Sequence, residues 1–73
     1  MYRTTDFYLA CWLCYLNKPF AGIEREGSRA TFIFEQVAKE DILQYYNRDK
    51  VEMDPLGFVS AIRHTRELLY NLP

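Results

Sequence analysis

The residues of this chain best suited to chemistry are two cysteines three positions apart, Cys11 and Cys14. In redox proteins such a pair lies at a helix N-terminus, where the helix dipole stabilises a thiolate. Here the pair lies inside an apolar run, where burial raises the pKa of a thiol and keeps it unreactive. A zinc site needs four ligands, and the single histidine, His64, is distant in sequence. We therefore expect both cysteines to be small core residues. Redox use or metal binding is the alternative, and a zinc site would need cysteine pairs from two chains.

His64 is the only histidine of the chain, and no Ser or Cys lies near it on a plausible catalytic loop. Glu67 lies three residues later on the same predicted helix, so a surface contact between the two is the simplest expectation. The acidic pairs of the chain are accounted for by helix starts and by a solvent-facing strand. The three glycines are isolated, which excludes a glycine-rich phosphate loop. The sequence predicts no catalytic residue, no cofactor and no metal site, and hence no enzyme.

Four arginines are candidate ligands for phosphate or for an acidic partner: Arg25, Arg29, Arg63 and Arg66. The last two form a small basic cluster with His64, and Tyr70 follows Arg66 by four residues. Glutamates are interleaved with both pairs, and the formal net charge is −1. Nucleic-acid binders of this size are usually strongly basic, because phosphate neutralisation supplies most of their affinity. Nucleic-acid binding is therefore the alternative function rather than the favoured one.

The composition predicts one small globular domain over residues 1–73. Of the 73 residues, 49% are hydrophobic and 16% are aromatic, which gives a short chain much area to bury. The longest apolar run is shorter than the roughly 20 residues that span a bilayer. Asp6 precedes this run directly and no small-residue cleavage site follows it, unlike a signal peptide. We expect a cytoplasmic, unprocessed protein without membrane contact.

The apolar run from Phe7 to Leu16 is predicted to be a helix over residues 5–17. It is rich in Leu, Ala and Cys and lacks Val and Ile, which favours a helix over a buried strand. A threonine hydroxyl before the run can cap the helix, and Asp6 suits the positive end of the helix dipole. Asn17 can adopt the left-handed conformation that ends a helix, and Pro19 prevents its continuation.

Residues 20–35 are predicted to form an antiparallel hairpin around a two-residue loop, Gly27-Ser28. This loop fixes the register, which pairs Glu26 with Arg29, Glu24 with Thr31 and Gly22 with Ile33. The other face then holds the apolar residues Ala21, Ile23, Ala30, Phe32 and Phe34. A sheet packed on one side requires such an alternation. Because a hairpin alone is unstable in water, helices must pack on it.

The second half of the chain is predicted to contain two helices, which gives an α+β fold. Residues 37–48 form the first, and Asp54-Pro55 start the second, with aspartate as N-cap and proline at the first helical position. Residues 51–53 alternate in polarity and could add a short third strand. The expected order is a helix, a two-stranded hairpin and two further helices.

Four short segments, in this order, carry a resemblance to a known family: Thr5-Asp6-Phe7-Tyr8-Leu9-Ala10, Gly22-Ile23-Glu24-Arg25, Thr31-Phe32-Ile33-Phe34, and Asp54-Pro55-Leu56 with Phe58. The chain resembles a family of small bacterial and phage domains to which no activity is assigned. The resemblance covers residues 4–70 and rests mainly on core and capping residues. It implies a bacterial or phage origin and assigns no catalytic residue, substrate or cofactor.

Helical geometry divides the first predicted helix into two stripes. One is made largely of small residues, which lets a helix lie close on the hairpin: Phe7, Ala10, Cys11 and Cys14. We expect it to cover Ile23, Phe32 and Phe34. The other stripe holds Leu9, Trp12, Leu13 and Leu16, and Tyr8 and Tyr15 flank it. Tyr8 joins these four residues as a candidate interaction residue.

A helix that is apolar all round must be covered all round. The second stripe is therefore covered either by the later helices of the same chain or by another molecule. Leucine and aromatic side chains in one patch suit an interface core. The function favoured by the sequence is a non-enzymatic protein-interaction module with a protein partner or a second copy of itself, and the resemblance extends this to phage or mobile-element biology.

Overall fold

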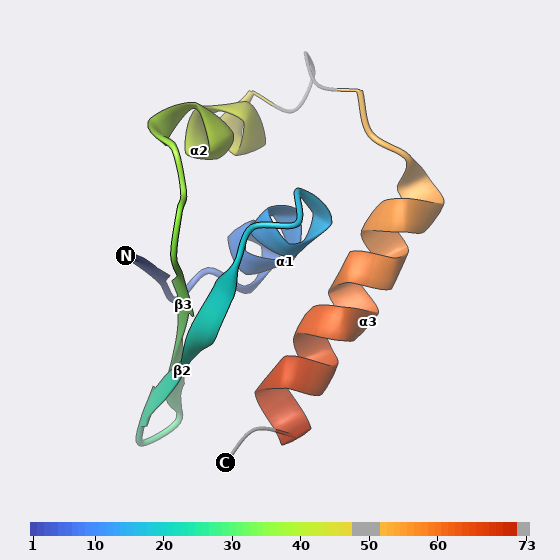
Figure 1. Ribbon diagram of the computed structural model, residues 1–73. Coiled ribbons are helices and arrows are strands. Elements are labelled where there is room, and N and C mark those ends of the chain that lie inside the picture. The colour runs from blue at the N-terminus through green and yellow to red at the C-terminus, as the bar shows by residue number, and fades with distance from the viewer. Residues whose placement is uncertain (48–51, 72–73) are drawn as a thin grey trace.

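Within the residues that the structure describes, the chain forms three helices and a three-stranded antiparallel sheet (Figure 1). The computed structural model describes residues 1–47 and 52–71. Its elements are β1 (Tyr2–Thr4), α1 (Phe7–Tyr15), β2 (Phe20–Glu26), β3 (Arg29–Phe34), α2 (Lys39–Tyr46) and α3 (Pro55–Asn71). The predicted α+β class is confirmed, whereas the predicted two-stranded sheet and the helix-first order need correction.

Helix α1 lies at the centre of the molecule, between the sheet and the two other helices (Figure 1). It is two residues shorter at each end than predicted. The N-cap is Asp6 and not a threonine: its carboxylate accepts from the backbone N–H of Tyr8 at 3.0 Å and of Leu9 at 3.2 Å. Thr4 instead accepts from the backbone N–H of Asp6, at 3.0 Å. The aspartate thus satisfies two amides that the first helical turn leaves unpaired.

The C-terminal end of α1 matches the prediction for Asn17. This residue has a φ of 60°, in the left-handed region. Its backbone N–H donates to the carbonyl of Cys14 at 2.9 Å, and the N–H of Lys18 donates to the carbonyl of Leu13 at 3.0 Å. These two bonds form a Schellman motif, which satisfies carbonyls at the helix end and turns the chain towards β2.

The hairpin has the predicted register near its turn. Glu26 pairs with Arg29, Glu24 with Thr31 and Gly22 with Ile33. The prediction fails for Ala21, because an irregularity between Phe20 and Gly22 shifts the pairing. Phe20 takes the place opposite Phe34, where the two rings meet edge to face with centroids 5.6 Å apart, and Ala21 is exposed. The larger aromatic side chain thereby fills the core position.

Strand β3 is central in the sheet order β1-β3-β2, because the unpredicted strand β1 pairs with its other edge. Ile33 was expected on the polar face but is only 8% exposed. On that face, Arg3 of β1 and Glu24 of β2 form an ion pair at 2.6 Å across β3. Three consecutive residues of β3, Phe32 to Phe34, are buried, so both faces of this central strand are covered at its end.

Helix α2 begins two residues later than predicted, so Val37 precedes it, and residue 48 lies outside the described residues. Its N-cap, Ala38, has no polar side chain. Asp41 takes over the capping role, since its Oδ2 accepts from the backbone N–H of Ala38 at 2.9 Å. The Lys18 ammonium lies 3.0 Å from the same oxygen. The Trp12 indole N–H donates to the Asp41 carbonyl at 3.0 Å, which attaches α2 to α1.

Helix α3 begins at Pro55, as predicted, and Asp54 accepts from the backbone N–H of Gly57 at 3.1 Å. The Tyr15 hydroxyl accepts from the backbone N–H of Asp54 at 3.0 Å and so fixes the helix start against α1. The proposed strand at residues 51–53 is not supported. Glu52 and Met53 lie outside any strand, and residue 51 is outside the described residues. Without regular alternation over four or more residues, this segment carries too little signal for a strand.

Candidate functional site

The apolar stripe predicted for association is covered largely by the chain itself. The exposed fractions are 1% for Leu9, 5% for Trp12 and 0% for Leu13. These residues share a core with Phe32, Phe34 and Tyr45, which come from β3 and α2. Leu16 is half-buried, and Tyr8 is 54% exposed. The intramolecular alternative therefore holds for Leu9, Trp12 and Leu13, and their side chains are not available to a partner.

The two cysteines mark the side of α1 that faces α3. Cys11 is fully buried, Cys14 is half-buried, and both thiols adjoin the hydroxyl of Thr65. This corrects the expectation that the small stripe covers the sheet. Phe7 does contact the ring of Phe32, with centroids 6.2 Å apart, but the cysteines allow the close approach of α3. Burial raises the pKa of both thiols, and the Thr65 hydroxyl opposes this shift. Both are free cysteines.

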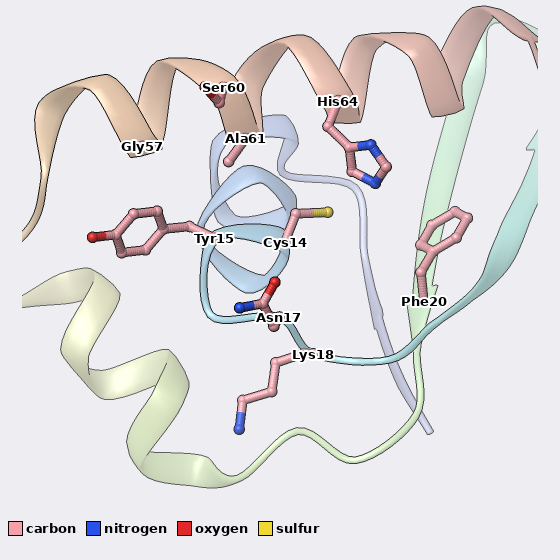
Figure 2. A pocket seen from close by; sticks show the side chains of 9 residues that line it. All are labelled: Cys14, Tyr15, Asn17, Lys18, Phe20, Gly57, Ser60, Ala61 and His64. Carbon is pink, nitrogen blue, oxygen red and sulfur yellow. The ribbon is translucent and has the colours of Figure 1, made fainter.

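An open groove of about 650 Å³ lies between the end of α1, the start of β2 and the first half of α3. Figure 2 shows that the Cys14 thiol and the His64 ring extend into it from different helices, with the Phe20 ring beside them. The lining residues are Cys14, Tyr15, Asn17, Lys18, Phe20, Gly57, Ser60, Ala61 and His64. Nothing in the local sequence indicates that Cys14 and His64 line the same groove, because this depends on how α1 crosses α3.

The charged groups at this groove do not activate the Cys14 thiol or the His64 imidazole for catalysis. No carboxylate is among its lining residues, so none can orient the His64 imidazole there. The raised pKa of Cys14 keeps the thiol protonated at neutral pH, whereas the thiolate is the nucleophile. The Lys18 ammonium is engaged by Asp41. Between His64 and Glu67, both within the described residues, the structure shows neither a hydrogen bond nor an ion pair, contrary to the predicted contact.

The four candidate arginines are not gathered into one patch. Arg25 donates a hydrogen bond to the backbone carbonyl of Leu69 on α3. Arg29 is exposed beside the hairpin turn and pairs in register with Glu26. Arg63 and Arg66 are exposed on α3, and neither forms a hydrogen bond or ion pair with any residue in the described part of the chain. These two guanidinium groups are therefore available to a partner.

A surface that the sequence analysis indicated only in part, through Arg63, Arg66 and Tyr70, runs along the side of α3 turned away from α1. We call it the α3 outer face, and it comprises Leu56, Val59, Arg63, Arg66 and Tyr70. Leu56 and Tyr70 are each 78% exposed, and Val59 is 44% exposed. A spacing of three and four residues, visible in the sequence, places Leu56 and Val59 on the same helix face as the other three residues.

Residues 1–47 and 52–71 lack two further features, a metal-binding cluster and a membrane-spanning helix. No group of three or more His, Cys, Asp or Glu side chains there could hold a metal ion. In the same residues, no helix has the length and apolar character needed to cross a membrane.

Comparisons with protein-family models, with curated proteins and with solved structures find no match to this chain. The candidate site therefore rests on the geometry of the chain itself, and the α3 outer face brings exposed apolar side chains and arginines together on one helix.

Proposed function

We propose that this chain is a non-enzymatic protein-interaction module of bacterial or phage origin, and that the α3 outer face binds its protein partner. The observation that carries the proposal is the exposure of Leu56 and Tyr70, each 78%, on the same helix face as two unpaired arginines. Single exposed apolar residues are ordinary on a protein surface. An aligned set with tyrosine and arginine has the composition of interface hot spots.

The rest of the molecule supports this assignment because its core closes without the α3 outer face. Phe58, Ala61, Thr65 and Leu69 on the opposite side of α3 pack inwards. None of the five residues of the α3 outer face belongs to the buried core. Its leucine and tyrosine keep apolar area in water, which a partner would remove.

The test uses three immobilised baits and extracts of the cells that encode the protein. The first bait is the wild type, and the second is Leu56→Ser with Tyr70→Ser. The third is Leu43→Ser with Tyr46→Ser, which changes the same residue types on α2, where they are 49% and 64% exposed. We expect a protein that the wild type and the α2 variant retain and the α3 variant loses. Retention by all three baits would contradict the proposal.

Nucleic-acid binding by Arg63 and Arg66 is tested separately, by a gel-shift assay. Nonspecific phosphate affinity is largest at low salt, so a gel shift under those conditions is its most sensitive measurement. We expect no shift with single- or double-stranded nucleic acid. A shift that disappears in Arg63→Glu with Arg66→Glu would assign the α3 outer face to nucleic acid instead.

A further inference from the structure

We propose that the partner segment bound by the α3 outer face is an acidic amphipathic helix, which packs along α3 and places carboxylates against Arg63 and Arg66. This inference rests on the function proposed above and narrows it to one class of ligand. Three features of the described residues carry it: the spacing of the face, the position of its charges and its size.

The spacing of the α3 outer face indicates a helical occupant. Its residues follow one another by three, four, three and four positions: Leu56, Val59, Arg63, Arg66 and Tyr70. This alternation is the heptad repeat by which one helix packs side chains between those of another. In a coiled coil these would be the a and d positions that form the seam. From Leu56 to Tyr70 the seam runs about 21 Å at 1.5 Å per residue, which a partner helix of three to four turns would cover.

The charges of the α3 outer face indicate that acidic side chains lie in the middle of the partner helix. The two arginines lie between apolar residues at both ends, and neither is neutralised by the described part of the chain. Covering an unpaired guanidinium costs desolvation free energy unless a carboxylate meets it. A bidentate arginine–carboxylate pair also fixes the register of the two helices. The fitting ligand is therefore apolar, then acidic, then apolar along one side.

A second copy of this chain is a poor occupant of the same face. In a parallel pair of α3 helices, Arg63 and Arg66 would each lie near the same residue of the other copy. In an antiparallel pair centred on the seam, Arg63 would lie opposite its own counterpart, because it is the middle residue of the five. Both arrangements place like charges together, which is destabilising. The face thus selects a different chain.

The size of the face limits the affinity. Stable complexes bury about 800 Å² per partner, to which roughly 20–30 residues on each side contribute. The α3 outer face consists of five residues. We expect a transient complex whose binding weakens with salt, because part of its attraction is between exposed charges.

The experiment measures binding of synthetic three-heptad helical peptides to the whole protein by fluorescence anisotropy. The acid peptide has leucine at the outer seam positions and glutamate at the central ones, and matched peptides carry lysine or glutamine there. We expect the acid peptide to bind at least about tenfold more tightly than the lysine peptide, with the glutamine peptide between them. Equal binding of the three peptides, or no binding of the acid peptide at millimolar concentration, would overturn the inference.

Reversing the charge of the two arginines shows whether they cause the preference for the acid peptide. In Arg63→Glu with Arg66→Glu we expect the preference to invert in favour of the lysine peptide. Arg29→Glu with Lys39→Glu makes the same change in net charge at exposed positions of the hairpin and of α2, and should keep the preference for the acid peptide. If both double variants behave alike, overall charge and not the seam governs binding, and the inference fails.

This failure is distinguishable from failure of the proposed function. Should the cellular partner be lost from the Leu56→Ser/Tyr70→Ser bait while the peptides show no charge preference, the α3 outer face remains an interaction surface and only the acidic helix is wrong. If the bait retains every protein that the wild type retains, the proposed function itself is wrong.

Discussion

At the scale of the residue, Asp41 connects α2 to Trp12 of α1 and to Lys18. Its carboxylate caps α2 through the backbone N–H of Ala38 and pairs with Lys18, while its carbonyl receives the Trp12 indole. Desolvation by burial raises the pKa of Asp41, but the Ala38 N–H and the Lys18 ammonium outweigh it and hold the pKa below its ordinary value. The charged form is therefore the form that stabilises the fold.

Asp41→Asn tests this role because it removes the charge and nearly keeps the shape. We expect it to lower the free energy of unfolding by about 1–2 kcal/mol at neutral pH, the range for a hydrogen bond to a charged group. A lowered pKa contributes stability that is lost as the pH falls through the folded-state value. The wild type should therefore lose stability below about pH 4, and the variant should lose less.

Urea unfolding at pH 7 and at a second, acidic pH measures both effects, because protonation of the Asp41 carboxylate removes its advantage over asparagine as the pH falls. The difference between the two proteins should shrink at the lower pH. A difference of equal size at both pH values would show that the charge of Asp41 is not what stabilises α2.

At the scale of the element, the packing of α1 on α3 depends on small residues at the contact. Ala61 is 8% exposed and Thr65 is fully buried, and they face the side of α1 that carries Cys11 and Cys14. The Thr65 hydroxyl donates to the Ala61 carbonyl at 2.7 Å, so the buried oxygen is satisfied within its own helix. Large side chains in this layer would push the helices apart.

Ala61→Leu is predicted to destabilise the fold by about 1–3 kcal/mol, the usual cost of overpacking a close contact. Val59→Leu, on the opposite side of the same helix, should change stability by less than about 0.5 kcal/mol, because Val59 lies on the α3 outer face. Chemical denaturation of both variants gives the comparison. Equal destabilisation by the two would mean that α3 is not oriented as described.

At the scale of the whole molecule, the parts that the sequence predicts well are those determined locally. The two residues of the Gly27-Ser28 turn fix the hairpin register, and Asp54 with Pro55 fixes the start of α3. Strand β1 was missed because three residues are too few for a recognisable alternation, and its partner β3 lies some thirty positions later. A distant pairing of this kind leaves no mark in local sequence.

In the candidate site, too, local sequence predicts some features, whereas others depend on contacts between distant parts of the chain. Each cysteine was expected in the core; Cys11 is buried there, whereas Cys14 is only half-buried. The groove shared by Cys14 and His64 could not be predicted, because it exists only where α1 crosses α3. The covering of Trp12 and Leu13 likewise depends on where α2 lies, which no local pattern specifies. The α3 outer face was recognisable in principle from its spacing alone.

The central claim is that the α3 outer face is where another protein binds, and photo-crosslinking in the cells that encode the chain tests it most directly. Benzoyl-phenylalanine is placed at Val59 on that face or, as a control, at Leu43 on α2; the two side chains are similarly exposed, at 44% and 49%. We predict that light produces a discrete heavier adduct from position 59 and none from position 43. An adduct from position 43 alone, or equal yields from both, would contradict the claim.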